Sequence, residues 1–100
     1  MSYVFTQDVP ITAEMYAQLR VELGDAAPVG LVAHLATANE GGGLHYVDIW
    51  QTREDFERFR DARLHPALGR FFARVGFTPP GGEPPMRELD VVDLWAPNMV

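Results

Sequence analysis

The chain has 100 residues, 47% of them hydrophobic, which is enough for one folded domain over residues 1–100. Its formal net charge of −6 at pH 7 argues against a nucleic-acid or anionic membrane partner, because no basic patch can displace counterions. The sequence contains neither lysine nor cysteine, which excludes Schiff-base lysines, thiol nucleophiles, disulfides and thiolate-bound metals.

Strand-like and helix-like segments alternate along the chain. Thr12 is a typical N-cap residue and Gly24 a typical C-terminal stop, so we expect a helix between them. The stretch 39–43, with three glycines, predicts a hairpin turn, and the proline- and glycine-rich stretch 78–85 predicts a loop. The predicted elements are a strand over 3–9, a helix over 13–23, strands over 29–37 and 44–51, a helix from 53 onward, and a strand over 87–95.

The clearest local signal is at Thr52, where a strand passes directly into a helix. Thr52 is a good N-cap, and Asp55 has the capping-box spacing that satisfies amides of the first turn. Phe56 and Phe59 fall on one helical face and can pack back on the strand. We expect this helix to break at His65–Pro66, because proline disfavours helical geometry in the preceding residue, and to restart at Pro66.

The element order β-α-β-β-α-β predicts a ferredoxin-like α+β fold, with a four-stranded antiparallel sheet and two helices on one face. The second face of such a sheet would then expose apolar side chains, which is unfavourable for a monomer. We therefore expect a homodimer in which two sheets cover each other. The residues expected on the exposed face are Leu31, Leu35, Val47, Ile49, Leu89 and Val91, or their alternates.

The segments 47–59 and 64–68 together resemble the middle of small dimeric α+β barrel proteins of the antibiotic-biosynthesis-monooxygenase-like superfamily. In topology the resemblance covers almost the whole chain. It implies a homodimeric barrel with a cavity between sheet and helices in each subunit. It also implies one of several activities, which are cofactor-independent oxygenation of polycyclic phenols, lactone isomerisation and haem degradation, although some members have no known activity.

The haem-degrading members of this superfamily have a helix tryptophan followed by a haem-ligating histidine. Here Phe59 stands where the tryptophan would be, and Gly69 falls at the spacing of the histidine. We therefore assign no haem ligand and expect no cofactor. The oxygenases use asparagine, tryptophan and arginine in their cavity, and of these only Trp50 is a loose match.

The best constellation for chemistry is a histidine–carboxylate pair in the predicted hairpin. If the hairpin is symmetric about Gly41, then His34 lies opposite Asp48 on one sheet face. A histidine oriented by a carboxylate can remove a proton from a phenol or an activated C–H group. The same pair is also explained as a satisfied polar pair in a partly buried sheet.

Aromatic residues are expected to surround this pair. In the same register Val32 lies opposite Trp50 and Ala36 opposite Tyr46, all on the face that carries His34. Trp50, Tyr46 and Phe59 are the candidate substrate-binding walls, although each is also a plausible core residue.

Histidines elsewhere in the chain carry weaker hypotheses. His65 is a further candidate for substrate contact, and its alternative role is to cap a helix end. We expect no metal site, because the histidine spacing matches no ligand motif and His45 points to the other sheet face.

Two functions are consistent with these patterns. One is a cofactor-independent enzyme for the oxygenation, isomerisation or cyclisation of a hydrophobic, aromatic or polyketide-like small molecule, with His34 as base and Asp48 as its orienting group. The other is a non-catalytic dimeric barrel that binds a ligand or a protein. No charged, apolar leader and no run long enough to span a membrane is recognisable, so we expect a cytoplasmic protein.

Overall fold

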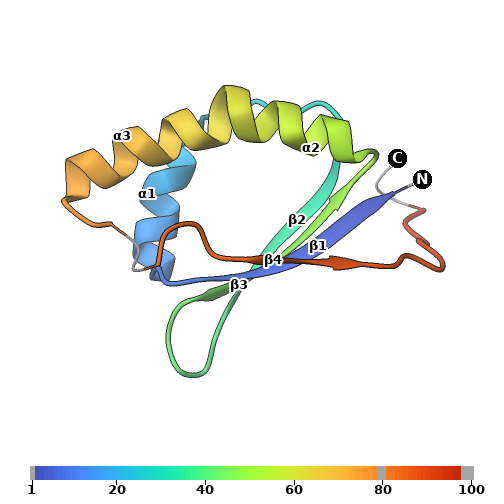
Figure 1. The fold of residues 1–100 in the computed structure, drawn as a ribbon, viewed down its shortest axis with the longest axis horizontal. Helices are drawn as coiled ribbons and strands as arrows, with labels where there is room; N and C mark the ends of the chain where they lie inside the picture. Colours follow the sequence, from blue (N-terminus) through green and yellow to red (C-terminus); the bar gives the residue numbers. More distant parts are fainter. Residues whose placement is uncertain (1, 79–80, 98–100) are drawn as a thin grey trace.

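The computed structural model describes residues 2–78 and 81–97. One antiparallel sheet is formed by four strands in the order β2-β3-β1-β4, and the helices all cover one face of it (Figure 1). This arrangement confirms the predicted ferredoxin-like α+β fold. The elements are β1 (Tyr3–Val9), α1 (Ala13–Leu23), β2 (Leu31–Ala38), β3 (Leu44–Trp50), α2 (Arg53–Phe59), the π-helical turn η1 (Arg60–Leu64), α3 (His65–Val75) and β4 (Met86–Leu89).

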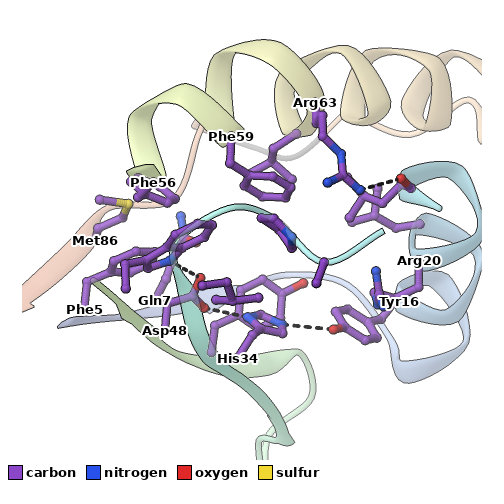
Figure 2. Close-up of a pocket in the computed structure, with 18 of the residues that line it drawn as sticks. Phe5, Gln7, Tyr16, Arg20, His34, Asp48, Phe56, Phe59, Arg63 and Met86 are labelled. Carbon is purple, nitrogen blue, oxygen red and sulfur yellow. Dashed lines mark hydrogen bonds and ion pairs between the residues drawn. The ribbon is translucent and has the colours of Figure 1, made fainter. Parts of the chain in front are cut away.

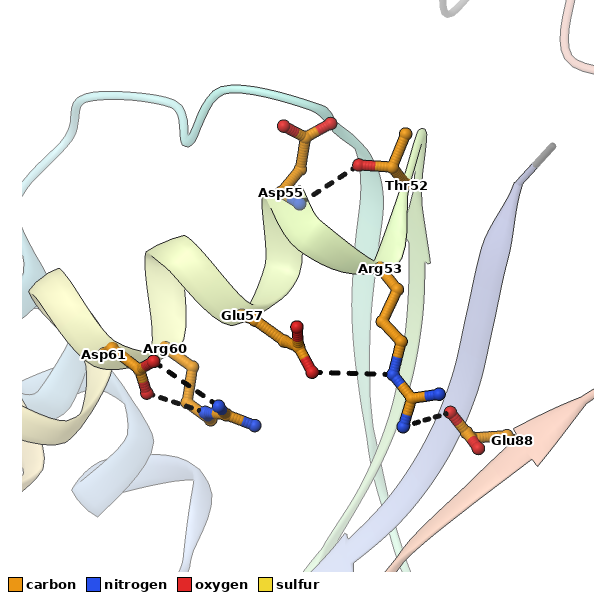
Figure 3. A network of polar contacts seen from close by, with 7 residues as sticks. All are labelled: Thr52, Arg53, Asp55, Glu57, Arg60, Asp61 and Glu88. Atoms are coloured by element: carbon orange, nitrogen blue, oxygen red, sulfur yellow. Dashed lines mark hydrogen bonds and ion pairs between the residues drawn. The ribbon is translucent and has the colours of Figure 1, made fainter.

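Both predicted helix caps are present. The Thr12 hydroxyl accepts a hydrogen bond from the backbone N–H of Met15 at 3.0 Å, and the Thr52 hydroxyl accepts one from that of Asp55 at 3.1 Å (Figure 3). Gly24 ends α1 with a φ of 82°, a backbone conformation that glycine adopts without a steric penalty. These local signals therefore set the starts of both helices and the end of the first.

The predicted helix break at His65–Pro66 is a change of helix type and not an interruption, and the predicted restart at Pro66 is confirmed to within one residue, because α3 begins at His65. The chain stays helical from Arg53 to Val75, and the five residues Arg60–Leu64 form a π-helical turn between α2 and α3. Proline lacks an N–H and its ring clashes with the carbonyl four residues earlier, so a regular α-helix cannot continue through it. The wider π turn accommodates this defect without ending the helix. None of the helices within the described ranges is long and apolar enough to cross a membrane.

The last strand is shorter than predicted. The expected strand over 87–95 is β4 (Met86–Leu89), and the chain after Leu89 forms no strand up to residue 97. The reason is the length of its partner, because β4 pairs with β1 as far as Val4↔Leu89 and β1 begins at Tyr3. The loop predicted over 78–85 includes Pro79 and Pro80, which lie outside the described residues.

Most of the predicted hairpin register is confirmed. His34 lies opposite Asp48, and Ala36 lies opposite Tyr46. Because successive side chains alternate between faces, these four residues share the face that the helices cover. The register near the turn could be predicted from the sequence because no bulge interrupts the pairing there.

The predicted pairing of Val32 with Trp50 is wrong. A bulge between Leu31 and Ala33 shifts the register by one residue, so that Leu31 lies opposite Trp50. The extra residue reverses which side chains face the helices at this end of β2. Leu31, which was expected on the exposed face, therefore packs against the buried aromatic residues.

Two groups of buried side chains hold the helices to the sheet and to each other. The first contains Phe5, Trp50 and Phe56, and the second contains Leu19, Ala67 and Phe71. In the first group the ring centroids of Phe5 and Phe56 are 4.7 Å apart. Arg53 adds a polar connection between α2 and β4, with its Nη2 3.3 Å from Glu88 Oε2 (Figure 3).

The sheet face away from the helices is apolar and partly exposed. Leu35 is 55% exposed and Leu89 39%, while Val47 and Ile49 are half-buried. Of the residues expected on this face, Leu31 packs on the other side for the reason given above, and Val91 lies beyond the end of β4. The sheet thus presents apolar surface that no described segment covers completely.

Candidate functional site

A cavity of about 380 Å³ lies between the sheet and the helices. The strands contribute side chains of His34, Tyr46, Asp48 and Trp50, and the helices contribute Tyr16 among others. Figure 2 shows Tyr16, His34 and Asp48 directed into one space, with Phe5, Phe56 and Met86 at one end and Arg20 and Arg63 at the other. This volume is in the range of small-molecule sites.

Four polar groups form a hydrogen-bonded chain along the cavity wall. His34 Nδ1 lies 2.5 Å from Asp48 Oδ1, and the indole Nε1 of Trp50 donates to Asp48 Oδ2 at 3.1 Å. On the other side of the ring, His34 Nε2 lies 2.9 Å from the hydroxyl oxygen of Tyr16 (Figure 2). The sequence Trp50–Asp48–His34–Tyr16 therefore runs from the buried core to the cavity.

The hydrogen bonds of Asp48 assign the tautomer of the neutral histidine. An ionised carboxylate only accepts hydrogen bonds, so the proton of the neutral ring is on Nδ1. The lone pair of Nε2 then accepts the hydrogen bond from Tyr16. Asp48 is 7% exposed, and no other charged residue is buried within the described part of the chain. Both of its carboxylate oxygens have hydrogen-bond partners. His34 is thus held in the form that a general base needs.

Two tyrosines stand beside the histidine. The ring centroid of His34 is 5.0 Å from that of Tyr46 and 6.0 Å from that of Tyr16. Burial raises the pKa of the Tyr46 phenol well above its usual range, and the neighbouring Tyr16 and Asp48 raise it further. Burial also raises the pKa of Tyr16, against the effect of the Arg20 charge. Both phenols therefore remain protonated hydrogen-bond donors at neutral pH.

Five of the six predicted site residues meet in the cavity, namely His34, Asp48, Trp50, Tyr46 and Phe59. His65 does not line it. Its Nε2 lies 3.1 Å from Glu83 Oε1, and the Glu83 side chain is the one that reaches the cavity. His65 stands at the junction of the π-helical turn and α3, and among the described residues its side chain contacts Glu83 and no helix-end carbonyl.

The third histidine is separate from this site. His45 Nδ1 lies 2.9 Å from Asp8 Oδ1, and neither residue lines the cavity that contains His34. Within residues 2–78 and 81–97, no three histidine or acidic side chains gather into a group that could hold a metal ion.

Several lining residues were not identified from the sequence, among them Tyr16, Arg20, Arg63 and Gln7. Tyr16 lies on the same helix as the buried Leu19, and its helical spacing was the only available signal. Arg63 lies in the π-helical turn, whose direction no simple periodicity predicts. Gln7 donates from its side-chain amide to the carbonyl oxygen of Pro84 at 2.8 Å, which joins β1 to a distant loop.

Comparisons with known proteins were made for sequence and for structure. No family model and no curated protein matches the sequence. The structure is similar to a "putative Antibiotic biosynthesis monooxygenase" from Chloroflexus aurantiacus J-10-fl, with a TM-score of 0.64 and 12% identity over 96% of this chain and 98% of that one. It is also similar to Rv0793 from Mycobacterium tuberculosis, with a TM-score of 0.58 and 20% identity over 95% and 98% of the two chains.

A third solved structure, a "putative antibiotic biosynthesis monooxygenase" from Deinococcus radiodurans, matches with a TM-score of 0.50 and 14% identity. The match covers 96% of this chain and 97% of that one. The low identities mean that these likenesses concern the backbone arrangement. The chain has the ferredoxin-like fold of the antibiotic-biosynthesis-monooxygenase-like proteins.

Proposed function

We propose that the chain is a cofactor-independent enzyme of the antibiotic-biosynthesis-monooxygenase-like type. Its substrate is a hydrophobic aromatic or polyketide-like molecule with an acidic hydroxyl or C–H group, and the reaction is an oxygenation, an isomerisation or a cyclisation. The observation that carries this proposal is the Trp50–Asp48–His34–Tyr16 chain in the wall of a cavity of about 380 Å³.

Proton removal is the step that these residues support. The substrate hydroxyl takes the place of the Tyr16 hydroxyl at His34 Nε2, or it passes its proton through Tyr16. His34 then becomes an imidazolium, and the Asp48 carboxylate bonded to Nδ1 stabilises that charge. General-base catalysis of this kind accelerates a reaction by about 10²–10⁴-fold.

The resulting carbanion or phenolate has three possible fates, which correspond to the three reactions. Protonation at a second carbon gives an isomer, and attack on a carbonyl of the same molecule gives a ring. Reaction of the carbanion with dioxygen and a proton forms a C–O bond and gives a hydroperoxide. Loss of water from the hydroperoxide breaks its O–O bond and leaves a C=O group, so that dioxygen is the oxidant, one of its oxygen atoms stays in the product and the other leaves as water. The aromatic walls Trp50 and Phe59 position the rings and limit access of water.

Homodimerisation and a cytoplasmic location belong to the same proposal. A second copy that packs on the sheet face carrying Leu35 and Leu89 would bury their exposed apolar surface. The cavity lies on the opposite side of the sheet, so dimerisation in this way leaves it accessible.

The second candidate function is a non-catalytic barrel that binds a small molecule or a protein. One observation favours it. The hydroxyl of Tyr16 already forms a hydrogen bond with His34 Nε2, so the Trp50–Asp48–His34–Tyr16 chain is fully hydrogen-bonded without a substrate. In this alternative His34 and Asp48 stabilise the sheet, and the cavity only stores or senses a ligand.

Deuterium exchange into anthrone distinguishes the two functions. Anthrone is a three-ring ketone with an acidic C–H group that becomes a phenolate on deprotonation. Under argon in deuterated buffer, the wild-type protein should accelerate exchange, and His34→Gln should reduce the acceleration by about 10²-fold or more. In air, oxygen consumption by the same samples shows whether oxygenation follows.

His45→Gln is the matched control, because His45 also contacts a carboxylate but lies outside the cavity that contains His34. It should leave exchange at the wild-type rate. Acceleration by wild type that survives in His34→Gln would remove His34 from the mechanism. Binding of anthrone without any acceleration would favour the non-catalytic barrel.

A further inference from the structure

Two arginines line one end of the cavity. Arg63 Nη2 donates to the carbonyl oxygen of Leu23 at 3.1 Å, and Arg20 Nη1 lies 3.4 Å from that of Gly24. Leu23 and Gly24 are consecutive residues at the end of α1, so the two guanidinium groups are tethered to neighbouring points. Figure 2 shows Arg20 and Arg63 at the end of the cavity where Tyr16 lies.

These two arginines differ from most of the others in having no acidic partner among the described residues. The arginines that do form ion pairs with Asp or Glu are Arg53, Arg58, Arg60, Arg70 and Arg74. Asp25 lines the same end of the cavity and is exposed, but it forms no ion pair with either arginine in the described part of the chain. Two cations thus line the cavity, and neither forms an ion pair with a carboxylate among the described residues.

Each guanidinium keeps unused hydrogen-bond donors. An arginine has five N–H donors in a fixed plane, and Arg20 and Arg63 each use one on a backbone carbonyl. The guanidinium carbon of Arg63 also lies 5.3 Å from the centre of the Phe59 ring, which holds its plane against the cavity wall. The planar fork of arginine matches a carboxylate in a bidentate manner.

We propose that Arg20 and Arg63 form a subsite for an anionic group, so that the ligand is an aromatic carboxylate. The ring system extends from the arginines along Phe59 toward Trp50, and a hydroxyl on it reaches His34, beside Tyr16. The position of the hydroxyl rests on the proposed function. The carboxylate subsite does not, because it requires binding only.

The competing role for both arginines is to cap the C-terminal end of α1. Such a cap needs only the observed contacts with Leu23 and Gly24. Loss of a cap would lower the melting temperature, and it would weaken the binding of charged and neutral ligands equally. Loss of an anion subsite would weaken only the charged ligand, and this difference is measurable.

Calorimetric titration with 6-hydroxy-2-naphthoate and with 2-naphthol separates these roles. The two probes share the naphthalene ring and hydroxyl, and only the first has a carboxylate. Wild type should bind the carboxylate about 10-fold more tightly or better, and Arg63→Gln or Arg20→Gln should each remove most of that preference. The affinity for 2-naphthol should change by less than about two-fold, because no charged hydrogen bond is lost.

Arg87→Gln is the matched control, since Arg87 is an exposed arginine that neither lines the cavity nor pairs with an acid among the described residues. It should leave both affinities unchanged. Equal affinity of wild type for the two probes, or equal losses for both probes in the variants, would overturn the proposal. Melting curves of all variants identify any loss of folding, and Arg63→Lys, which keeps the charge, should retain part of the preference.

Anthrone exchange measured on the same proteins separates this inference from the proposed function. A wild-type preference for the carboxylate without acceleration of exchange supports the anion subsite and contradicts the enzyme proposal. Acceleration of exchange without that preference overturns the subsite and leaves the enzyme proposal in place.

Discussion

Asp48 connects the core of the protein with the candidate site. One of its carboxylate oxygens accepts from the buried indole of Trp50, and the other contacts the ring of His34. The indole thereby fixes the orientation of the carboxylate, and the carboxylate fixes the tautomer of the histidine. Trp50 is 1% exposed, so this polar arrangement has a rigid support.

Asp48→Asn should reverse the tautomer of His34. The Trp50 N–H still needs an acceptor, so the amide oxygen of Asn turns to Trp50 and its NH₂ group turns to His34 Nδ1. Nδ1 then becomes the acceptor and Nε2 carries the proton, which leaves no basic nitrogen toward the cavity. Nitrogen-15 NMR of the ring measures the tautomer directly, and proton-transfer activity should fall by about 10²–10⁴-fold.

The matched variant for this experiment is Asp8→Asn. Asp8 contacts His45 Nδ1 at 2.9 Å on the surface, so the substitution makes the same chemical change outside the cavity. It should leave the His34 ring signals and the activity unchanged. A His34 ring that keeps its proton on Nδ1 in Asp48→Asn would show that Asp48 does not determine the tautomer.

Residues of the candidate site differ in how well the sequence predicted them. His34 and Asp48 lie in one hairpin, whose symmetric turn made their pairing readable. Tyr16 belongs to α1 and reaches His34 only through tertiary packing, and no local pattern encodes that contact. Arg63 points to the cavity from a π-helical turn, where the regular helical period does not apply.

At the scale of elements, Gly30 controls how β2 begins beside α2. Its carbonyl oxygen accepts a hydrogen bond from the backbone N–H of Gln51 at 2.8 Å, and its φ is 85°. A Cβ atom at this position would overlap the side chain of Asp55 in the first turn of α2. The strand and the capped helix can therefore approach this closely only with glycine at position 30.

Gly30→Ala should destabilise the protein by about 1–3 kcal/mol, because it adds a strained backbone conformation and a steric overlap. Urea unfolding followed by circular dichroism measures the change. Gly41→Ala serves as the comparison, since position 41 has open space around it and no left-handed φ, and its free energy of unfolding should stay close to that of wild type. Equal stability of the two variants would contradict this account of the strand–helix junction.

Local chemistry predicted where elements begin better than where they end. The hydroxyl caps of α1 and α2 are short-range interactions, and both starts were predicted correctly. The end of β4 depends on the length of β1, which lies far away in the sequence, and the predicted strand was too long. The bulge beside Leu31 likewise follows from packing against Trp50 and not from the turn.

At the scale of the whole molecule, the sheet divides the protein into two functional sides. The helix-covered side contains the cavity, and the opposite side presents Leu35 and other apolar residues. A second copy of the chain is the occupant that we propose for that apolar side. Catalysis and assembly would then depend on alternate residues of the same strands, as with His34 and Leu35.

Leu35→Glu should convert the proposed dimer to a monomer, because it places a charge on the apolar face, at a side chain that is 55% exposed. Sedimentation velocity measures the mass in solution. Val21→Glu is the control, since Val21 is 81% exposed on α1, away from the sheet, and it should leave the dimer intact. A wild-type protein that sediments as a monomer would contradict the dimer, and a dimer that persists in Leu35→Glu would place the interface elsewhere.

The pairing of β1 with β4 has a consequence for synthesis of the chain. β1 pairs with β3 along one edge and with β4 along the other, and the second ladder joins Val4 to Leu89. One edge of β1 therefore has no partner until Met86–Leu89 has left the ribosome. During that interval its free N–H and C=O groups can recruit strands of other chains. β4, which is made about 80 residues after β1, is thus the strand that protects this edge of β1.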